Sequence, residues 1–486
     1  MKRDWMVVVA AAVVLLGSCR PEVGKVETLF DGTGIEPWRA EAAPGTFQLE
    51  GNELVCSGGP GTLVWEGGRT FRDFVLEAEL KTEPGAFALF HFHQARPFDA
   101  RVSQGYAVVV ANTPCTMEEP ALAMKSGSLY GVRHVYFPMV RDGEWFRLKV
   151  RVSGNQAETW INGVRVMEYI QPAQPWRGEE NAGRLFSEGT VALQLTSGTM
   201  RMKSCRVELL PPGEALPLRV DEAWDATVTR MMEEGFPLID FHTHLKGGLT
   251  IEQAIENAQR LGINYGIAPN CGLKFPVTND VSLAAYMDTV AGKPIFRGMQ
   301  AEGREWITLF SPGAVARFDY VFTDALTFTD ARGRRNRLWI PEEVWVEDKE
   351  QFMDQLVGKI EAIMSQEPVD IYVNPTLLPD ALMPDYDRLW TPERVARVIR
   401  VLKENGIALE INARYRVPSA AIIKAAREAG LRFSFGTNNA AADLGQLEYC
   451  LQMIDSCGLT PREMFLPPVH EKKPVLIKGL PDKITG

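Results

Sequence analysis

Apolar and polar residues alternate along most of the first half of the chain. Between about residues 26 and 210, segments such as FVLEAEL at 74–80 and FRLKVRV at 146–152 place an apolar residue at every second position, and Gly, Pro, Asn and Asp separate the segments. A period of two is typical of strands with one buried face, and short strands at this spacing favour a sandwich. The first half is therefore predicted to be an all-β sandwich.

The period changes after the Pro-rich stretch LLPPGEALPL. A linking helix is expected next, and then apolar strand-like segments alternate with amphipathic helical patterns such as TPERVARVIRVLKENG. This alternation indicates a parallel sheet covered by helices, and seven repeats fit a closed α/β barrel better than the alternative, an open doubly wound sheet. The predicted domains are a sandwich at 26–211, a linker and helix at 212–235, a barrel at 236–468 and a tail at 469–486. The seven predicted strands are PLIDFHTH (237–244), NYGIAPN (264–270), PIFRGMQAE (294–302), DYVFTDA (319–325), DIYVNP (370–375), ALEINAR (408–414) and RFSFGTNN (432–439).

The composition is that of a globular protein with more than one domain. The chain has 486 residues, 45% of them hydrophobic, and a formal net charge of −10 with no block of Lys or Arg. This length allows two hydrophobic cores. The lack of a basic block argues against a nucleic-acid partner. The cysteines form no CxxC motif, so we predict neither a zinc knuckle nor a disulfide framework.

The first residues have the features of a secretory signal. Lys2 and Arg3 precede an apolar stretch that ends in LGSC, which resembles the bacterial lipoprotein box with Cys19 as the lipidated residue. A cleaved secretory signal without a lipid is the alternative. No later apolar run reaches the roughly 18 residues that a bilayer crossing needs. We therefore expect a signal peptide at 1–19 and a protein of the bacterial cell envelope, facing the periplasm or the exterior, that meets the membrane only through a lipid anchor.

Polar side chains occur at the end of every predicted barrel strand. His242 and His244 lie two residues apart at the end of the first strand, so both rings point to the same face. The carboxyl ends of parallel barrel strands converge over one mouth, and we expect these side chains to meet in one pocket there. The other strand ends supply Asn270, Gln300, Glu302, Asp324, Asn374, Glu410, Asn412 and Asn438.

Imidazole and carboxylate groups together suit a divalent first-row metal ion. Zn²⁺ or Mn²⁺ held by His242, His244, Glu302 and Asp324 would polarise a substrate oxygen or lower the pKa of a bound water. Glu302, Asp324 and Glu410 are the candidate catalytic carboxylates, and the amides would orient substrate hydroxyls. The alternative is a sugar-binding barrel without a metal, in which the histidines only form hydrogen bonds. The stretch 330–348 after the fourth strand is a candidate lid or rim of the site.

The second half resembles a known family of metal-dependent hydrolases. The segment DFHTHLKGGLTIEQAIENAQRLGI and the six units that follow resemble the PHP (polymerase and histidinol phosphatase) family, whose barrel has seven strands and whose HxH motif falls on His242 and His244. Three other family motifs differ. Pro269-Asn270, Asn374-Pro375 and Thr437-Asn438-Asn439 stand where the family usually carries Asp-His, His-Pro and Ser-Asp-Ala-His. The resemblance therefore implies at most one metal, held by the two histidines and carboxylates.

The first half resembles the 3-keto-disaccharide hydrolase domain, a concanavalin-like jelly roll. The segments TLFDGTGIEPW, KSGSLYG and DGEWFRLKV carry the resemblance, which spans about residues 27–211. The family's Glu-x-Gln pattern is replaced by Ala107-Val108-Val109, so these positions supply no general base or metal ligand. The residues left to line a sugar site are His91, His93, Tyr130 and His134, although the two strand histidines also fit the polar face of an ordinary strand.

Together these features predict a carbohydrate-acting envelope lipoprotein. The first hypothesis is a metal-assisted hydrolase in which Glu302 or Glu410 moves a proton, with a glycan or a carbohydrate-derived small molecule as substrate. In it the sandwich gathers glycan or shapes the rim of the barrel mouth. The second is a non-catalytic glycan-binding lipoprotein with degenerate sites in both domains, and the third places catalysis in the sandwich.

Overall fold

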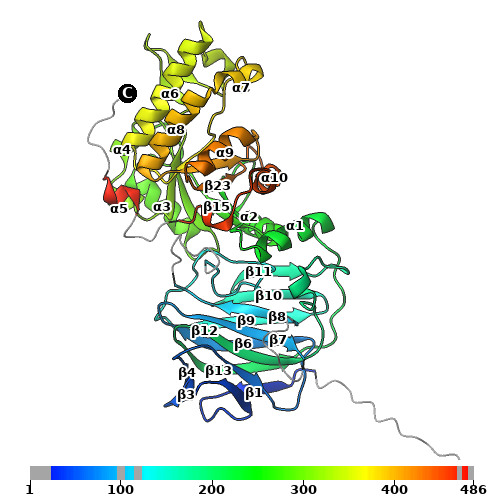
Figure 1. Ribbon diagram of the computed structural model, residues 1–486. Helices are drawn as coiled ribbons and strands as arrows, with labels where there is room; N and C mark the ends of the chain where they lie inside the picture. Colours follow the sequence, from blue (N-terminus) through cyan, green and yellow to red (C-terminus); the bar gives the residue numbers. More distant parts are fainter. Residues whose placement is uncertain (1–22, 96–103, 114–122, 468–472, 480–486) are drawn as a thin grey trace, which may run out of the picture.

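The first domain is an antiparallel β-sandwich, as predicted (Figure 1). The computed structural model describes residues 23–95, 104–113, 123–467 and 473–479. In β6 (Phe74–Thr82) buried and half-buried residues alternate along the whole strand, because one face packs on the core and the other faces solvent. The larger sheet has the order β11 (Val164–Ile170), β10 (Gln156–Ile161), β9 (Phe146–Ser153), β6, β13 (Met200–Leu209), β4 (Glu53–Cys56) and β3 (Phe47–Glu50), and β1 (Val26–Phe30) also pairs with β13. The smaller sheet has the order β2 (Trp38–Ala42), β5 (Gly61–Trp65), β12 (Thr190–Ser197), β7 (Phe87–Gln94) and β8 (Tyr106–Val110).

The second domain is a closed parallel barrel of seven strands. Strand β15 pairs with both β14 and β17, and β14 pairs with β23, which closes the sheet on itself. The barrel strands are buried at nearly every position because helices cover the outside and side chains fill the inside. In barrel order they are β14 (Ile239–Thr243), β15 (Asn264–Ile267), β17 (Phe296–Ala301), β18 (Tyr320–Thr323), β21 (Ile371–Tyr372), β22 (Ala408–Asn412) and β23 (Phe433–Gly436). The closed barrel replaces the doubly wound alternative.

Helices follow the strands, with local sequence signals at their ends. Helix α8 (Pro392–Asn405) starts after Thr391, whose side chain accepts a hydrogen bond from the Arg394 N–H, and it ends at Gly406 with a φ of 68°. The other helices are α1 (Glu222–Glu233), α2 (Ile251–Leu261), α3 (Asp280–Val290), α4 (Trp306–Leu309), α5 (Pro312–Val315), α6 (Lys349–Gln366), α7 (Tyr386–Leu389), α9 (Ala420–Glu428), α10 (Glu448–Cys457) and α11 (Pro474–Ile477). A short strand β16 (Asn270–Cys271) extends the sheet beside β17, and β19 (Thr327–Thr329) pairs with β20 (Arg335–Arg337) as a hairpin.

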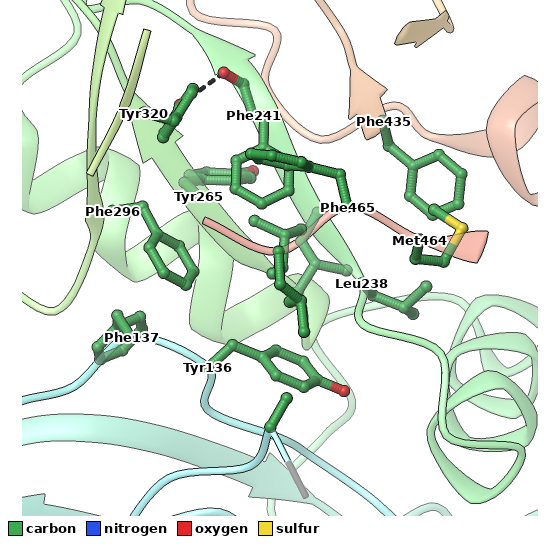
Figure 2. Close-up of a cluster of buried hydrophobic side chains, with 14 of the residues drawn as sticks. Tyr136, Phe137, Leu238, Phe241, Tyr265, Phe296, Tyr320, Phe435, Met464 and Phe465 are labelled. Atoms are coloured by element: carbon green, nitrogen blue, oxygen red, sulfur yellow. Dashed lines mark hydrogen bonds between the residues drawn. The ribbon is translucent and has the colours of Figure 1, made fainter. Parts of the chain in front are cut away.

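The barrel interior is a packed core rather than a pore. The Tyr320 hydroxyl donates a hydrogen bond of 2.6 Å to the carbonyl of Phe241 across the barrel, which Figure 2 marks with a dashed line. Two glycines make room for this ring, since a Cβ at Gly266 or Gly298 would lie 2.1 or 2.5 Å from the Tyr320 hydroxyl oxygen. The filled interior leaves the strand ends as the place for a ligand.

The sandwich packs against the amino-terminal end of the barrel. Tyr136 and Phe137 of the sandwich lie near Leu238 and Phe296 at the amino ends of barrel strands, and the ring centroids of Phe137 and Phe296 are 6.3 Å apart (Figure 2). The Tyr136 hydroxyl donates a hydrogen bond to the backbone carbonyl of Phe236. The backbone N–H of Tyr136 donates a second one to the side-chain oxygen of Asn264. The predicted role of the sandwich in shaping the barrel mouth is therefore wrong, because the mouth is at the opposite end of the same strands.

A buried ion pair also joins the sandwich to the linking helix. The Arg133 guanidinium contacts Asp225 of α1 and donates to the Thr229 hydroxyl at 3.1 Å, and both charged side chains are at most 6% exposed. Such a pair fixes the helix against the sandwich because either charge alone would be costly to bury.

Two further sequence expectations concern cysteines and membrane spans. The five cysteines in the described ranges are buried and free. Among the helices of these same ranges, none combines the length and the apolarity that a bilayer crossing requires. The predicted signal peptide and Cys19 lie outside the described residues.

Candidate functional site

A polar cavity of about 340 Å³ opens at the carboxyl ends of the barrel strands. Six of the predicted strand-end residues line it, which confirms that these ends converge. The lining residues are Lys246, Asn270, Phe275, Gln300, Glu302, Asp324, Leu326, Trp339, Asn374, Arg414, Tyr415, Asn438, Asn439 and Ala440.

His242 is buried beside this cavity and is held by a carboxylate. Its Nδ1 lies 2.6 Å from Oε1 of Glu410, and its backbone N–H donates to Asp240 at 3.1 Å. Gly436 makes this contact possible, because a Cβ there would lie 2.0 Å from the same Glu410 oxygen. A carboxylate at Nδ1 keeps the proton on that nitrogen and leaves the lone pair on Nε2.

His244 is fixed in the same tautomer by a different partner. Its Nδ1 lies 2.8 Å from the carbonyl of Ala268, which can only accept, and its backbone N–H donates to Oδ1 of Asn439 at 2.8 Å. Burial lowers the pKa of His244 well below its usual value, and the nearby His242 adds to this effect. The two ring centroids are 5.3 Å apart; within the described residues neither Nε2 has a well-formed hydrogen bond, and the side chain of Gln300 lies close enough to His244 to raise its pKa slightly.

Asn374 connects the strand ends into one network. Its N–H donates to Oε2 of Glu410 at 2.6 Å, and its side-chain NH₂ donates to Oδ2 of Asp324 at 3.3 Å. Its side-chain oxygen accepts hydrogen bonds from Asn412 and Asn438 at 3.1 and 2.9 Å. The residue has a φ of 47°, a left-handed conformation that Asn tolerates better than most residues. Asn374 therefore positions its neighbours as well as lining the cavity.

Glu410 and Asn412 do not reach the cavity. Both are fully buried, and Glu410 accepts hydrogen bonds from three groups, at His242, Asn374 and Asn412. The side-chain oxygen of Asn412 accepts from the N–H of residue 415. The predicted roles of Glu410 in proton transfer and of Asn412 in substrate binding are therefore wrong, because their polar atoms are already used inside the protein.

Glu302 and Asp324 both place a carboxyl group on the cavity wall. Burial, reinforced by the charge of Asp324, raises the pKa of Glu302 to about 8. Burial also raises the pKa of Asp324, against hydrogen bonds from the Leu326 N–H at 3.1 Å and from Asn374. Glu302 accepts a 2.6 Å hydrogen bond from Asn270. Asp324 receives two hydrogen bonds and Glu302 receives one, and the raised pKa of Glu302 leaves this carboxyl mostly protonated near pH 7.

The predicted metal ligands are only partly brought together. The two unpartnered Nε2 atoms fit a divalent ion, since a carboxylate or carbonyl behind each ring is the usual support of a metal-bound histidine. However, no group of three or more His, Cys, Asp or Glu side chains in the described ranges is placed to hold one ion. The four-ligand set with Glu302 and Asp324 is thus not assembled in this arrangement, and a metal at the histidine pair stays a prediction.

Several cavity residues were not predicted as site residues. Lys246 follows the HxH motif by two positions, and Arg414 and Tyr415 follow the sixth strand, so the same strand-end rule could have found them. Trp339 comes from the stretch 330–348 that was expected to form a rim, and it is 45% exposed. This placement confirms that the stretch contributes to the cavity.

The predicted sugar-binding residues of the sandwich do not form one site. His93 is buried, and its two ring nitrogens bond the carbonyl of residue 72 and the N–H of residue 187. His134 is buried at the domain interface and accepts from the N–H of residue 131. His91 lies 2.9 Å from the side chain of Gln194 and is half-buried, and the ring of Tyr130 faces a guanidinium at 5.1 Å. The predictions for His93 and His134 are wrong because each is a satisfied core histidine.

A family model matches the first half of the chain. Residues 25–208 match the family model of the 3-keto-alpha-glucoside-1,2-lyase-like domain, which confirms the resemblance of the first half. Comparison with curated proteins gives no match.

Three solved structures share a weak likeness with parts of this chain. A glycosyl hydrolase of unproven assignment from Parabacteroides distasonis is 16% identical, with coverage of 38% of this chain and 94% of its own and a TM-score of 0.33. A carbohydrate-binding module from Bacillus subtilis is 16% identical, covers 38% and 96%, and has a TM-score of 0.23. Histidinol phosphate phosphatase from Lactococcus lactis, with zinc, L-histidinol and phosphate bound, is 12% identical, covers 46% and 95%, and has a TM-score of 0.34. At these values none of the three indicates the chemistry of this chain.

Proposed function

We propose that the barrel site hydrolyses a bond in a carbohydrate or a carbohydrate-derived small molecule. The observation that carries the proposal is the Glu302–Asp324 pair on the wall of the amide-lined cavity, where Glu302 holds a proton at neutral pH. Two carboxyl groups at one cavity are suited to general acid and general base roles.

The residues take the following parts in hydrolysis of a glycosidic bond. Glu302 donates its proton to the leaving oxygen as the bond to the anomeric carbon breaks, and Asp324 accepts a proton from the attacking water. Asn270 and Asn374 orient the two carboxyl groups through their hydrogen bonds, and the exposed ring of Trp339 offers a face to a sugar ring. Glu302 then recovers its proton as Asp324 releases the one that it took.

A divalent ion is a further part of the proposal. His242 and His244 would hold it through their Nε2 atoms, with Glu410 and the Ala268 carbonyl supporting the rings. Such an ion lowers the pKa of a bound water or polarises a substrate oxygen. The site histidines, rather than Glu302 and Asp324, are its proposed ligands.

The location of the enzyme is also proposed from the sequence. The LGSC box at Cys19 supports a lipid-anchored protein of the bacterial cell envelope, with a glycan or small-molecule substrate and no nucleic-acid partner. Labelling with a radioactive fatty acid tests the anchor, and Cys19→Ala is expected to abolish the label.

An activity screen tests the catalytic proposal. Oxidised and ordinary disaccharides are offered to the wild type, to Glu302→Gln and to Glu404→Gln, an exposed carboxylate of α8 that serves as the matched control. The loss of a general acid is expected to lower the rate by roughly 10²–10⁴-fold in Glu302→Gln and to leave the control unchanged. Full activity of Glu302→Gln would refute the acid role, and sugar binding without turnover by the wild type would support the non-catalytic glycan-binding alternative.

A further inference from the structure

Two cations face the same cavity without a carboxylate of their own. Lys246 and Arg414 both line it, from the loops after β14 and β22. Arg414 donates to the carbonyl of Asn438 at 3.2 Å and stacks on the ring of Tyr415 at 5.5 Å. Among the residues that the structure describes, neither cation has an ion-pair partner. The two charges are thus placed beside each other and left for a ligand to neutralise.

Lys246 is half-buried on the cavity wall, and the carboxyl groups that line the same cavity are those of Glu302 and Asp324. Glu302 is itself mostly protonated at pH 7, because its pKa is raised to about 8. An anionic ligand group between the two cations would relieve their repulsion and would gain charge-assisted hydrogen bonds from both.

From this geometry we infer that the barrel site takes an acidic sugar whose carboxylate binds between Lys246 and Arg414. The inference rests on the proposed function for its sugar and adds the class of substrate, a uronic acid. A single negative charge matches this cavity better than a phosphate ester, which carries a charge near −2 and would meet the carboxyl groups of Glu302 and Asp324 on the same wall. The guanidinium of Arg414 is already oriented by Tyr415, so little ordering is needed on binding.

Calorimetric titration with three probes tests the inference. Glucuronic acid, glucose and glucose 6-phosphate are titrated into the full chain carrying Glu302→Gln, which prevents turnover during the measurement. We expect glucuronic acid to bind most tightly, and Lys246→Gln or Arg414→Gln to weaken it roughly ten- to a hundredfold, as for the loss of a charge-assisted hydrogen bond. Glucose binding should change less than threefold in either variant.

Matched controls come from the loop after β22, which holds Arg416, and from the loop after β16, which holds Lys274. Arg416→Gln and Lys274→Gln each remove a cation from the mouth region that does not line the cavity, and they are expected to leave all three affinities unchanged. Equal affinity for glucuronic acid and glucose, or a preference for glucose 6-phosphate, would overturn the inference. Either result leaves the acid role of Glu302 intact if disaccharides are still hydrolysed. Tight uronate binding without turnover in the wild type would instead refute only the proposed hydrolysis.

Discussion

Replacement of Glu302 by Gln is expected to stabilise the folded protein above about pH 5 while it removes activity. The folded state raises the pKa of this carboxyl from 4.5 to about 8. Because the folded pKa lies above the unfolded one, the contribution of Glu302 to stability is complete below pH 4.5 and is lost as the pH rises toward 8. The amide of Gln avoids this loss and can still accept the hydrogen bond from Asn270.

The size of the effect follows from the two pKa values. The free energy of unfolding changes by about 1.4 kcal/mol per pH unit in this range, so the penalty on the wild type reaches about 3 kcal/mol at pH 7 as an upper bound. Relaxation of Asp324 and entry of water reduce it, and we expect a measured difference of about 1–3 kcal/mol.

Urea unfolding of the wild type and Glu302→Gln at pH 5 and pH 8 measures this difference. The variant should be more stable than the wild type at pH 8, and the difference between their free energies of unfolding should shrink toward zero near pH 5. Glu404→Gln, which removes an exposed carboxylate, should follow the wild type at both pH values. A gap that does not depend on pH would show that Glu302 is ionised in the folded protein, and its role as the acid would be lost.

Three other substitutions probe the support of the site and the domain interface. Gly436→Ala places a methyl group 2.0 Å from the Glu410 carboxylate and is expected to destabilise by about 1–3 kcal/mol in thermal unfolding, and an unchanged midpoint would contradict the tight packing. Glu410→Gln removes the carboxylate behind His242 and should weaken Zn²⁺ binding about 10- to 100-fold by calorimetry, whereas unchanged affinity would rule out that supporting role. Asp225→Ala leaves Arg133 buried without its partner and should cost about 3–5 kcal/mol in urea unfolding; a cost below 1 kcal/mol would mean that water reaches the pair.

The architecture could be predicted from the sequence because it depends on local periodicity. The alternation in β6 and β9 reports which residues face the core, and the repeated change between strand and helix patterns reports a parallel sheet. All seven predicted barrel strands are present, and the helix expected after the linker is α1. The convergence of the strand ends followed from the geometry of a parallel barrel.

The role of each strand-end side chain could not be predicted from local periodicity. Glu302 follows β17 and lines the cavity, whereas Glu410 lies within β22 and is enclosed by His242, Asn374 and Asn412. Two of the partners of Glu410, His242 and Asn374, are 168 and 36 positions away from it in the sequence. Periodicity contains no information about such distances.

By itself, the sequence determined that a β-sandwich precedes a seven-stranded barrel with polar residues gathered at the strand ends, since each of these features is set by neighbours along the chain. Only the tertiary structure decided that the sandwich covers the amino-terminal end of the barrel and buries His134 there. It also decided that Lys246 and Arg414 meet over the cavity. These outcomes depend on contacts between segments far apart in the chain, where burial and neighbouring charge set both the exposure and the proton affinity of each group.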